Sequence, residues 1–94
     1  MTQLPTQVST SVTITNKRGL HARSSAKFVG LAATLAQPVN VAKDEHSVVG
    51  TSIMGLMMLG AAMGDTITIS AEGDGAAAAV AALVTLVEDK FGEE

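Results

Sequence analysis

The chain contains no cysteine, tryptophan or tyrosine, and it has only two phenylalanines and two histidines among its 94 residues. Without cysteine it can form neither a disulfide nor a thiolate metal site, and two histidines fall short of the four ligands of a structural zinc site. The scarcity of aromatic side chains argues against nucleic-acid modules that stack bases on aromatic platforms. A net charge of −3 also disfavours a broadly basic DNA-binding surface. We therefore expect no metal, no cofactor and no nucleic-acid partner.

Long hydrophobic runs are also missing. The uncharged stretch 47–64 has an apolar part, 53–63, of only eleven residues, whereas a helix needs roughly 20 to span a bilayer. Residues 1–7 have neither the basic start nor the apolar segment of a signal peptide. A chain of this length supports one core but not two. We expect a cytoplasmic protein without membrane insertion, made of a flexible tail, 1–7, and one domain, 8–94.

The charges are divided unevenly along the chain. Residues 1–43 carry five cations and no acid, whereas residues 44–94 carry all nine acids and only one cation. Four of the six cations lie between Lys17 and Lys27. A local cationic cluster on an acidic protein favours a small anionic ligand or an acidic protein partner. The alternative is that these charges only solvate a helix face.

Hydrophobic periodicity predicts seven elements. Strands are expected at 8–14, 39–41, 48–49 and 66–71, and helices at about 22–35, 53–59 and about 76–90. The order β-α-β-β-α-β-α indicates an α+β fold, with an antiparallel sheet and the helices packed on one face.

Apolar spacing also predicts which helix faces are buried. For the first helix the predicted stripe is Ala22, Ala26, Val29 and Ala33, with Phe28, Ala32 and Leu35 beside it. For the last helix it is Val80, Leu83, Val84, Val87 and Phe91.

The segment from Gly19 to Ala26 contains the strongest candidate site. Gly19 ends a strand region, and His21 falls at or beside the N-cap of the first helix. The first turn, from Ala22 onward, has unpaired N–H groups that can accept a phosphate-sized anion. Arg23 adds a planar donor fork for phosphate oxygens. The hydroxyls of Ser24 and Ser25 could donate hydrogen bonds to the same anion. Three further cations add a diffuse positive field: Lys17, Arg18 and Lys27.

His21 in this setting is a candidate nucleophile. A helix N-terminus disfavours a second proton on the imidazole, and a neutral imidazole has a free lone pair. A phosphoryl group on that nitrogen would lie over the helix amides and Arg23. The simpler alternative is a polar cap or a solvent-facing histidine. No acid precedes Asp44, so we expect no carboxylate near His21 that could position a hydrolytic water. The other histidine, His46, lies in a predicted turn without helper residues, so we assign it no role in the site.

The segment around His21 also resembles that of a known protein family. Gly19-Leu20-His21-Ala22-Arg23, followed by Ser25-Ala26, resembles the active-site segment of HPr, the histidine-containing phosphocarriers of the bacterial phosphotransferase system. The resemblance extends to 51–57 and 64–69 and covers about residues 8–91. It implies an open-faced β-sandwich, with three helices over a four-stranded antiparallel sheet. It also implies that enzyme I phosphorylates Nδ1 of His21, that Arg23 binds the phosphate, and that the group passes to an EIIA-type protein.

One departure from the family pattern is Ser24, which stands where the family usually has proline. Proline in the first helical turn fixes φ and removes an N–H that would be unpaired. Serine adds a donor but loosens the turn, so we expect phosphotransfer to be retained with altered kinetics. The stretch Ser24 to Val29 is more similar to HPr variants of the nitrogen-type branch than to those of sugar transport.

Ser52 is the second candidate site. Its chemistry alone predicts a helix cap, and the resemblance places it at the regulatory serine that HPr kinase/phosphorylase modifies in some bacteria. A phosphate there would add nearly two negative charges beside an apolar patch. We expect Leu56 and Leu59 to be buried and a partner interface formed by Leu20, Arg18, Lys27, Ile53, Met54 and Met57.

Three functions are candidates for this chain. The first is a monomeric phosphoryl carrier, stoichiometric in its relay and not an independent catalyst. The second is a purely regulatory HPr-like binding module, which would not need both His21 and Arg23. The third is an autonomous hydrolase, for which the sequence offers no general base near His21. The residues favour the carrier.

Overall fold

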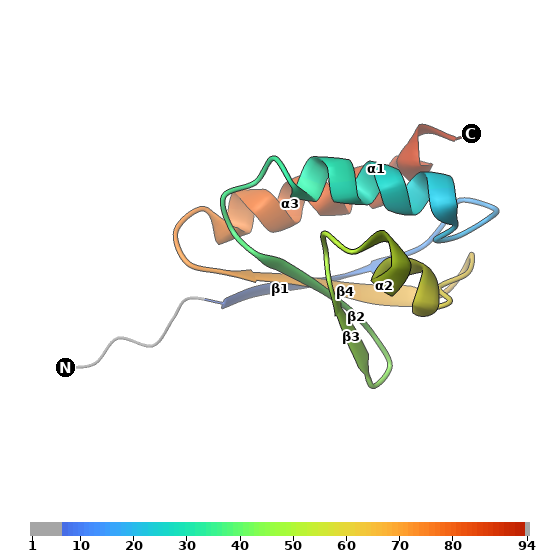
Figure 1. The fold of residues 1–94 in the computed structure, drawn as a ribbon, viewed down its shortest axis with the longest axis horizontal. Coiled ribbons are helices and arrows are strands. Elements are labelled where there is room, and N and C mark those ends of the chain that lie inside the picture. Colours follow the sequence, from blue (N-terminus) through green and yellow to red (C-terminus); the bar gives the residue numbers. More distant parts are fainter. Residues whose placement is uncertain (1–6, 94) are drawn as a thin grey trace.

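A computed structural model of the protein describes residues 7–93, so residues 1–6 of the expected tail lie outside the described residues. Gln7, expected in that tail, is the first residue of a strand. The elements are β1 (Gln7–Thr13), α1 (Ala22–Ala32), β2 (Val39–Lys43), β3 (His46–Val49), α2 (Ile53–Met58), β4 (Thr66–Glu72), α3 (Ala76–Glu88) and the 3₁₀ turn η1 (Lys90–Gly92). The predicted order of strands and helices is confirmed (Figure 1).

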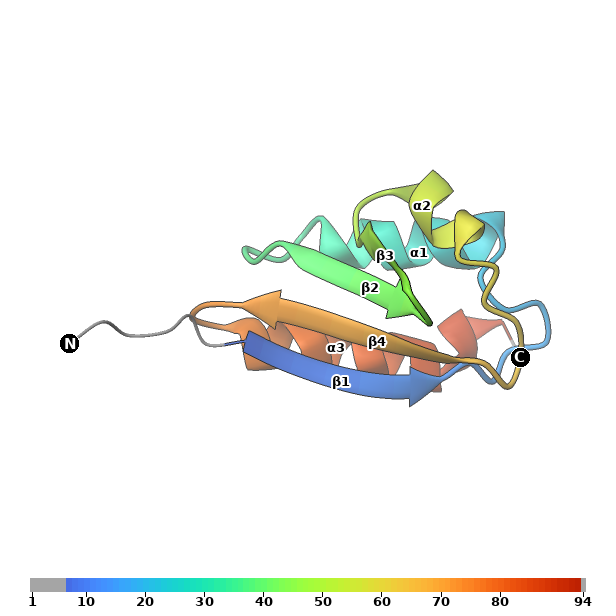
Figure 2. The same cartoon turned by 90° about the horizontal axis from the view of Figure 1, so that it is seen from below.

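The four strands form one antiparallel sheet in the order β1-β4-β2-β3. Figure 2 shows β4 and β2 in its middle, with β1 and β3 at the edges. The register places Val12 opposite Ile67, and both side chains are buried. Ser11 and Thr68, which are also opposite each other, share a hydroxyl hydrogen bond of 3.0 Å on the other face. The period-two alternation thus separates a core face from an open, hydroxyl-rich face.

The helices cover one face of this sheet, as the sequence predicted (Figure 1). Val80, Leu83 and Val87 of α3 are buried in the core, which confirms the predicted stripe. The stripe predicted for α1 is wrong, because Ala22, Ala26 and Ala33 are exposed. Of the residues predicted beside that stripe, Phe28 and Ala32 are buried, together with Ser24 and Ser25, which were not predicted. Phe28 has far more apolar surface than alanine, so its burial sets the rotation of the helix.

The C-terminal end differs most from expectation. The last helix ends at Glu88 and continues as η1, in which Lys90 and Phe91 have φ values of 58° and 55°. A left-handed conformation is unfavourable for side chains with a Cβ. Here it turns Phe91 into the core, where its side chain is 1% exposed. The turn places η1 against α1 and brings Glu93 to His21 at the start of that helix (Figure 1).

No helix within residues 7–93 combines the length and apolarity needed to traverse a bilayer.

Candidate functional site

The loop before α1 is fixed by a close backbone approach. Gly19 has φ +63°, and a Cβ at this position would lie 2.3 Å from the carbonyl oxygen of Ala61. The next amide, that of Leu20, donates to that same oxygen at 2.9 Å. Only glycine fits this backbone geometry. The contact therefore sets the direction in which the chain enters α1 and places the residue that follows Leu20.

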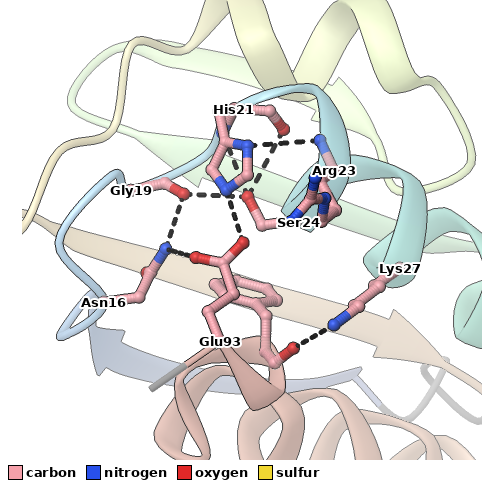
Figure 3. Close-up of polar contacts among 8 residues, drawn as sticks. Asn16, Gly19, His21, Arg23, Ser24, Lys27 and Glu93 are labelled. Carbon is pink, nitrogen blue, oxygen red and sulfur yellow. Dashed lines mark hydrogen bonds and ion pairs between the residues drawn. The ribbon is translucent and has the colours of Figure 1, made fainter.

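That following residue, His21, is the N-cap of α1, as predicted, and its backbone is extended. Its Nδ1 accepts a hydrogen bond from the backbone N–H of Arg23 at 3.3 Å (Figure 3). In return, the backbone N–H of His21 donates to the Ser24 hydroxyl at 3.0 Å. The two residues form a reciprocal capping box. The histidine side chain remains 23% exposed, so part of it is accessible to solvent.

The other ring nitrogen faces a carboxylate that the sequence did not predict. His21 Nε2 lies 2.5 Å from Oε2 of Glu93, and Oε1 of the same carboxylate accepts from Asn16 Nδ2 at 2.9 Å (Figure 3). The expectation that no carboxylate lies near His21 is wrong. Glu93 is 72 positions away in the chain, and no local pattern connects the two residues. Asn16 is fully buried, and it was not predicted as part of the site.

Two contacts hold the C-terminal turn in this place. The Phe91 side chain is buried in the core, and the Phe91 carbonyl oxygen accepts a hydrogen bond from Lys27 Nζ at 2.7 Å. Lys27 extends from the second turn of α1, so this hydrogen bond ties α1 to the turn that comes just before Glu93 (Figure 3). The Glu93 carboxylate is therefore positioned by packing as well as by its own hydrogen bonds.

The neutral imidazole has one defined tautomer in this arrangement. A carboxylate can only accept a hydrogen bond, whereas a backbone N–H can only donate one. The proton must therefore lie on Nε2, facing Glu93, and the lone pair on Nδ1, facing the Arg23 amide. Of the two ring nitrogens, Nδ1 is the one available as a nucleophile.

The pKa of Glu93 is lowered below its usual value of 4.5. Desolvation alone would raise this pKa, but it is outweighed by the hydrogen bonds from Asn16 and His21 and by the charges of His21 and Lys27. The site therefore stabilises the ionised carboxylate, which is the form that accepts both hydrogen bonds.

We expect the Glu93→Gln variant to reveal this effect through the pH dependence of stability. A lowered pKa in the folded state adds stability above pH 4.5 that is lost as the pH falls through the folded-state pKa. The wild-type protein should exceed the variant by on the order of 1 kcal/mol at neutral pH. Urea unfolding between pH 7 and pH 3 should show this difference shrinking towards the acid end. Glu72→Gln, which changes an exposed carboxylate of β4, is the control. A wild-type advantage over Glu93→Gln that stays constant with pH would contradict the assignment.

The predicted cations do gather around His21. An open hollow of about 450 Å³ is lined by Lys17, Arg18, His21, Arg23, Lys27, Gly92 and Glu93. Arg18, Arg23 and Lys27 are exposed. The hollow can admit a phosphoryl group, and its positive residues outnumber its single carboxylate. An anion would be attracted there by the summed field.

Two hydroxyls expected to face the ligand do not do so. Ser24 and Ser25 are fully buried, because the first turn of α1 packs against the protein along this face. The Ser24 hydroxyl bonds to its own loop and not to the hollow: it accepts from the His21 amide and donates to the Gly19 carbonyl at 2.8 Å. The Ser25 hydroxyl has no partner among the described residues. Ala22 is exposed at the first position of the helix.

Ser52 is the N-cap of α2, as predicted, and its hydroxyl accepts from the Gly55 amide at 2.9 Å. Leu56 and Leu59 are buried, as expected. The exposed apolar residues that follow Ser52 form what we call the methionine surface: Ile53, Met54, Met57, Met58 and Met63. Met58 and Met63, at 80% and 58% exposure, were not predicted for it. Leu20 was wrongly placed in the interface; it is 6% exposed and packs in the core.

Comparison with known proteins shows the family of this chain. The family model for the PTS HPr component phosphorylation site matches residues 8–89. The phosphocarrier protein HPr of Neisseria meningitidis serogroup A is 47% identical over 83 residues, covering 88% of this chain and 93% of that protein. The phosphocarrier protein NPr of Shewanella violacea is 40% identical over 88 residues, covering 94% and 97%.

Solved structures show the same fold. The crystal structure of HPr-C-His from Thermoanaerobacter tengcongensis superposes with a TM-score of 0.87 at 46% identity, covering 93% of this chain and 98% of that one. The four-stranded antiparallel sheet with three helices is thus the α+β fold that the resemblance implied. With the family match spanning nearly all of the domain, the chain belongs to the HPr family of phosphocarrier proteins.

Proposed function

We propose that the protein carries a phosphoryl group on Nδ1 of His21, receiving it from enzyme I and passing it to an EIIA-type protein. The observation that carries this proposal is the opposed arrangement at the two ring nitrogens. Glu93 holds the proton on Nε2, and the lone pair of Nδ1 lies at the amino end of α1. The nucleophilic nitrogen therefore lies beside the backbone amides that would stabilise the phosphoryl group bound to it.

The bonds, electron pairs and protons of the transfer are accounted for without a further reactant. The Nδ1 lone pair forms a bond to phosphorus while the bond from phosphorus to the donor atom of enzyme I breaks, and the donor atom keeps that electron pair. The proton on Nε2 stays beside Glu93 throughout. The incoming group replaces the hydrogen bond that Nδ1 accepts from Arg23, which frees that amide to donate to a phosphoryl oxygen. Onward transfer is the reverse, with His21 as the leaving group.

The surrounding charges support the same role. The Arg23 side chain lines the same hollow as His21, together with Lys17, Arg18 and Lys27. Cations in these positions stabilise the negative charge that spreads over the phosphoryl oxygens during transfer. The protein supplies this environment to a group that two larger partners donate and accept, and so acts as a stoichiometric carrier.

Glu93 does not turn the site into a hydrolase. Its carboxylate lies at Nε2, whereas the phosphoryl group would be on Nδ1 at the opposite side of the ring. Both carboxylate oxygens already accept hydrogen bonds, from His21 and Asn16. A general base would have to contact the water that attacks phosphorus, and Glu93 does not face that position.

The methionine surface is the proposed docking site for the two partners. Met54 and Met58 are 72% and 80% exposed on α2, which packs against α1, the helix that begins beside His21. Flexible thioether side chains adapt to different apolar partner surfaces, and Arg18 and Lys27 add charge that an acidic partner surface would complement. One surface could therefore serve donor and acceptor in turn.

Incubation with enzyme I and phosphoenolpyruvate labelled on phosphorus tests the proposal. The wild-type protein should take up label that is acid-labile and alkali-stable, as expected of phosphohistidine. Addition of an EIIA-type protein should then remove it. Absence of label on the wild-type protein would leave only the regulatory binding module. Label that is lost rapidly to water without an acceptor would favour the hydrolase.

We also propose that Ser52 is a regulatory phosphorylation site where a kinase of the HPr kinase/phosphorylase type is present. Ser52 is partly exposed at the start of α2, beside the methionine surface. A phosphate there adds nearly two negative charges next to the apolar docking residues. An acidic partner surface would be repelled, so phosphorylation at Ser52 would weaken docking without touching His21.

The Ser52→Ala variant should lose the label transferred by this kinase from ATP. It should also lose about 1 kcal/mol of stability, because the Gly55 amide loses its capping acceptor. Mass spectrometry of the kinase-treated proteins and urea unfolding measure the two effects. Thr51→Ala, at the exposed neighbouring hydroxyl, is the matched control and should keep the label. Full kinase-dependent label on Ser52→Ala would rule out this residue as the phosphosite.

A further inference from the structure

The Ser24 side chain makes hydrogen bonds to the backbone of His21 and of the loop before it. Ser24 is the third residue of α1 and is fully buried. Its hydroxyl accepts from the backbone N–H of His21 at 3.0 Å and donates to the Gly19 carbonyl at 2.8 Å. These two groups belong to Gly19 and His21, the residues on either side of Leu20, so one side chain fixes the backbone both before and after Leu20.

We infer that Ser24 is a positioning residue for His21, and that its hydroxyl holds the imidazole with Nδ1 at the amino end of α1. This inference rests on the proposed function, because its consequence is the rate at which Nδ1 takes up a phosphoryl group. The capping box makes the arrangement mutual: the histidine side chain caps the first amides of the helix while the serine side chain caps the histidine amide. Loss of either side chain releases the other.

The Gly19 carbonyl connects Ser24 to the opposite side of the ring. That oxygen accepts from the Ser24 hydroxyl and also from Asn16 Nδ2 at 2.9 Å (Figure 3). The same Asn16 nitrogen donates to Glu93, whose carboxylate faces Nε2. A continuous set of hydrogen bonds thus runs from the backbone below Nδ1 to the carboxylate beside Nε2. This network holds the ring through its backbone at one end and through Nε2 at the other. Ser24 is the residue that connects the network to α1.

The neighbouring residue provides a matched control. Ser25 is the next residue of α1, is equally buried, and its hydroxyl has no hydrogen-bond partner among the described residues. Ser24→Ala and Ser25→Ala remove the same atom from adjacent buried positions of one helical turn. They differ in whether that atom contacts the backbone of His21. A general effect of removing a buried hydroxyl would appear in both variants, whereas a positioning effect would appear only in the first.

The experiment compares the transfer rate from enzyme I with the state of the imidazole. Ser24→Ala should lower kcat for phosphorylation about tenfold, the range expected when a reacting group loses its fixed orientation. The KM for the carrier should stay unchanged, because Ser24 is buried and cannot contact enzyme I. The ¹⁵N shifts of His21 should move from a single tautomer, protonated on Nε2, towards a mixture. Ser25→Ala should match the wild-type protein in all three measurements.

A second variant tests the same inference by another route. Ser24→Pro removes both the hydroxyl and the N–H, and proline is tolerated in the first turn of a helix. Its ring restricts φ but cannot bond to Gly19 or His21, so the tautomer mixture should persist even if the helix is firm. Retention of the wild-type rate and of a single tautomer in Ser24→Ala would overturn the inference, as would equal losses in Ser24→Ala and Ser25→Ala.

The outcome is separable from that of the proposed function. If the wild-type protein takes no label, the carrier function fails, yet the ¹⁵N shifts still report whether Ser24 orients the ring. If the wild-type protein takes label and Ser24→Ala takes it equally fast, the carrier stands and the positioning role fails.

Discussion

The His21→Ala variant is expected to take up no phosphoryl label from enzyme I, while its fold remains intact. Alanine removes the lone pair that attacks phosphorus. The other side chains that line the hollow are four cations and Glu93, and none of them is an imidazole placed at the amino end of α1. The loss should be complete and not a matter of degree. Gel autoradiography after incubation with labelled phosphoenolpyruvate measures it, and thermal unfolding checks the fold.

His46→Ala is the matched control for this loss. His46 is the only other histidine, and it lies exposed in β3, paired in register with Lys43. Its removal should leave the label unchanged in amount and in acid lability. Label persisting on His21→Ala, or disappearing from His46→Ala, would contradict the assignment of the phosphoryl acceptor. A label that survives acid would indicate a different residue type altogether.

The part of the site that could be predicted from the sequence is the part that is continuous in the chain. His21, the helix amides and Arg23 lie within three positions, so a glycine followed by a helix start already brings them together. Glu93 and Asn16 could not be predicted, because their contact depends on how the last turn folds back. That turn requires left-handed backbone at Lys90 and Phe91, which neither residue type favours locally. Burial of the Phe91 side chain stabilises this left-handed turn. Whether that side chain is buried depends on the packing of the whole domain and not on the local sequence.

The same distinction explains the two helix faces. The stripe of α3 was predictable because its large apolar residues, such as Val80, Leu83 and Val87, leave one possible buried face. In α1, alanines are present on several sides, so the apolar pattern does not select a rotation. The helix instead buries Phe28 together with two serines, and the Ser24 hydroxyl is satisfied by loop backbone. A buried polar residue of this kind is invisible to hydrophobic periodicity.

Phe91→Ala is expected to have the largest effect on stability, about 3–5 kcal/mol. Phe91 is 1% exposed and belongs to the core cluster, so alanine loses the burial and leaves a cavity. The same change should release the C-terminal turn, because Phe91 is the apolar anchor of the segment that presents Glu93 to His21. Urea unfolding measures the first effect. The ¹⁵N shifts of His21 measure the second, since an unpinned Glu93 no longer fixes the proton on Nε2.

Phe28→Ala separates these two effects. Phe28 is the other phenylalanine and is fully buried in α1, so its loss should cost a similar free energy of unfolding without detaching the chain end. Glu93→Gln added to Phe28→Ala should therefore lower stability as it does in the wild-type protein, whereas added to Phe91→Ala it should have almost no effect. Where alanine unfolds the domain outright, Phe91→Leu allows the same comparison. An equal effect of Glu93→Gln in both backgrounds would mean that the carboxylate is held at His21 by its hydrogen bonds alone, without the buried ring that precedes it.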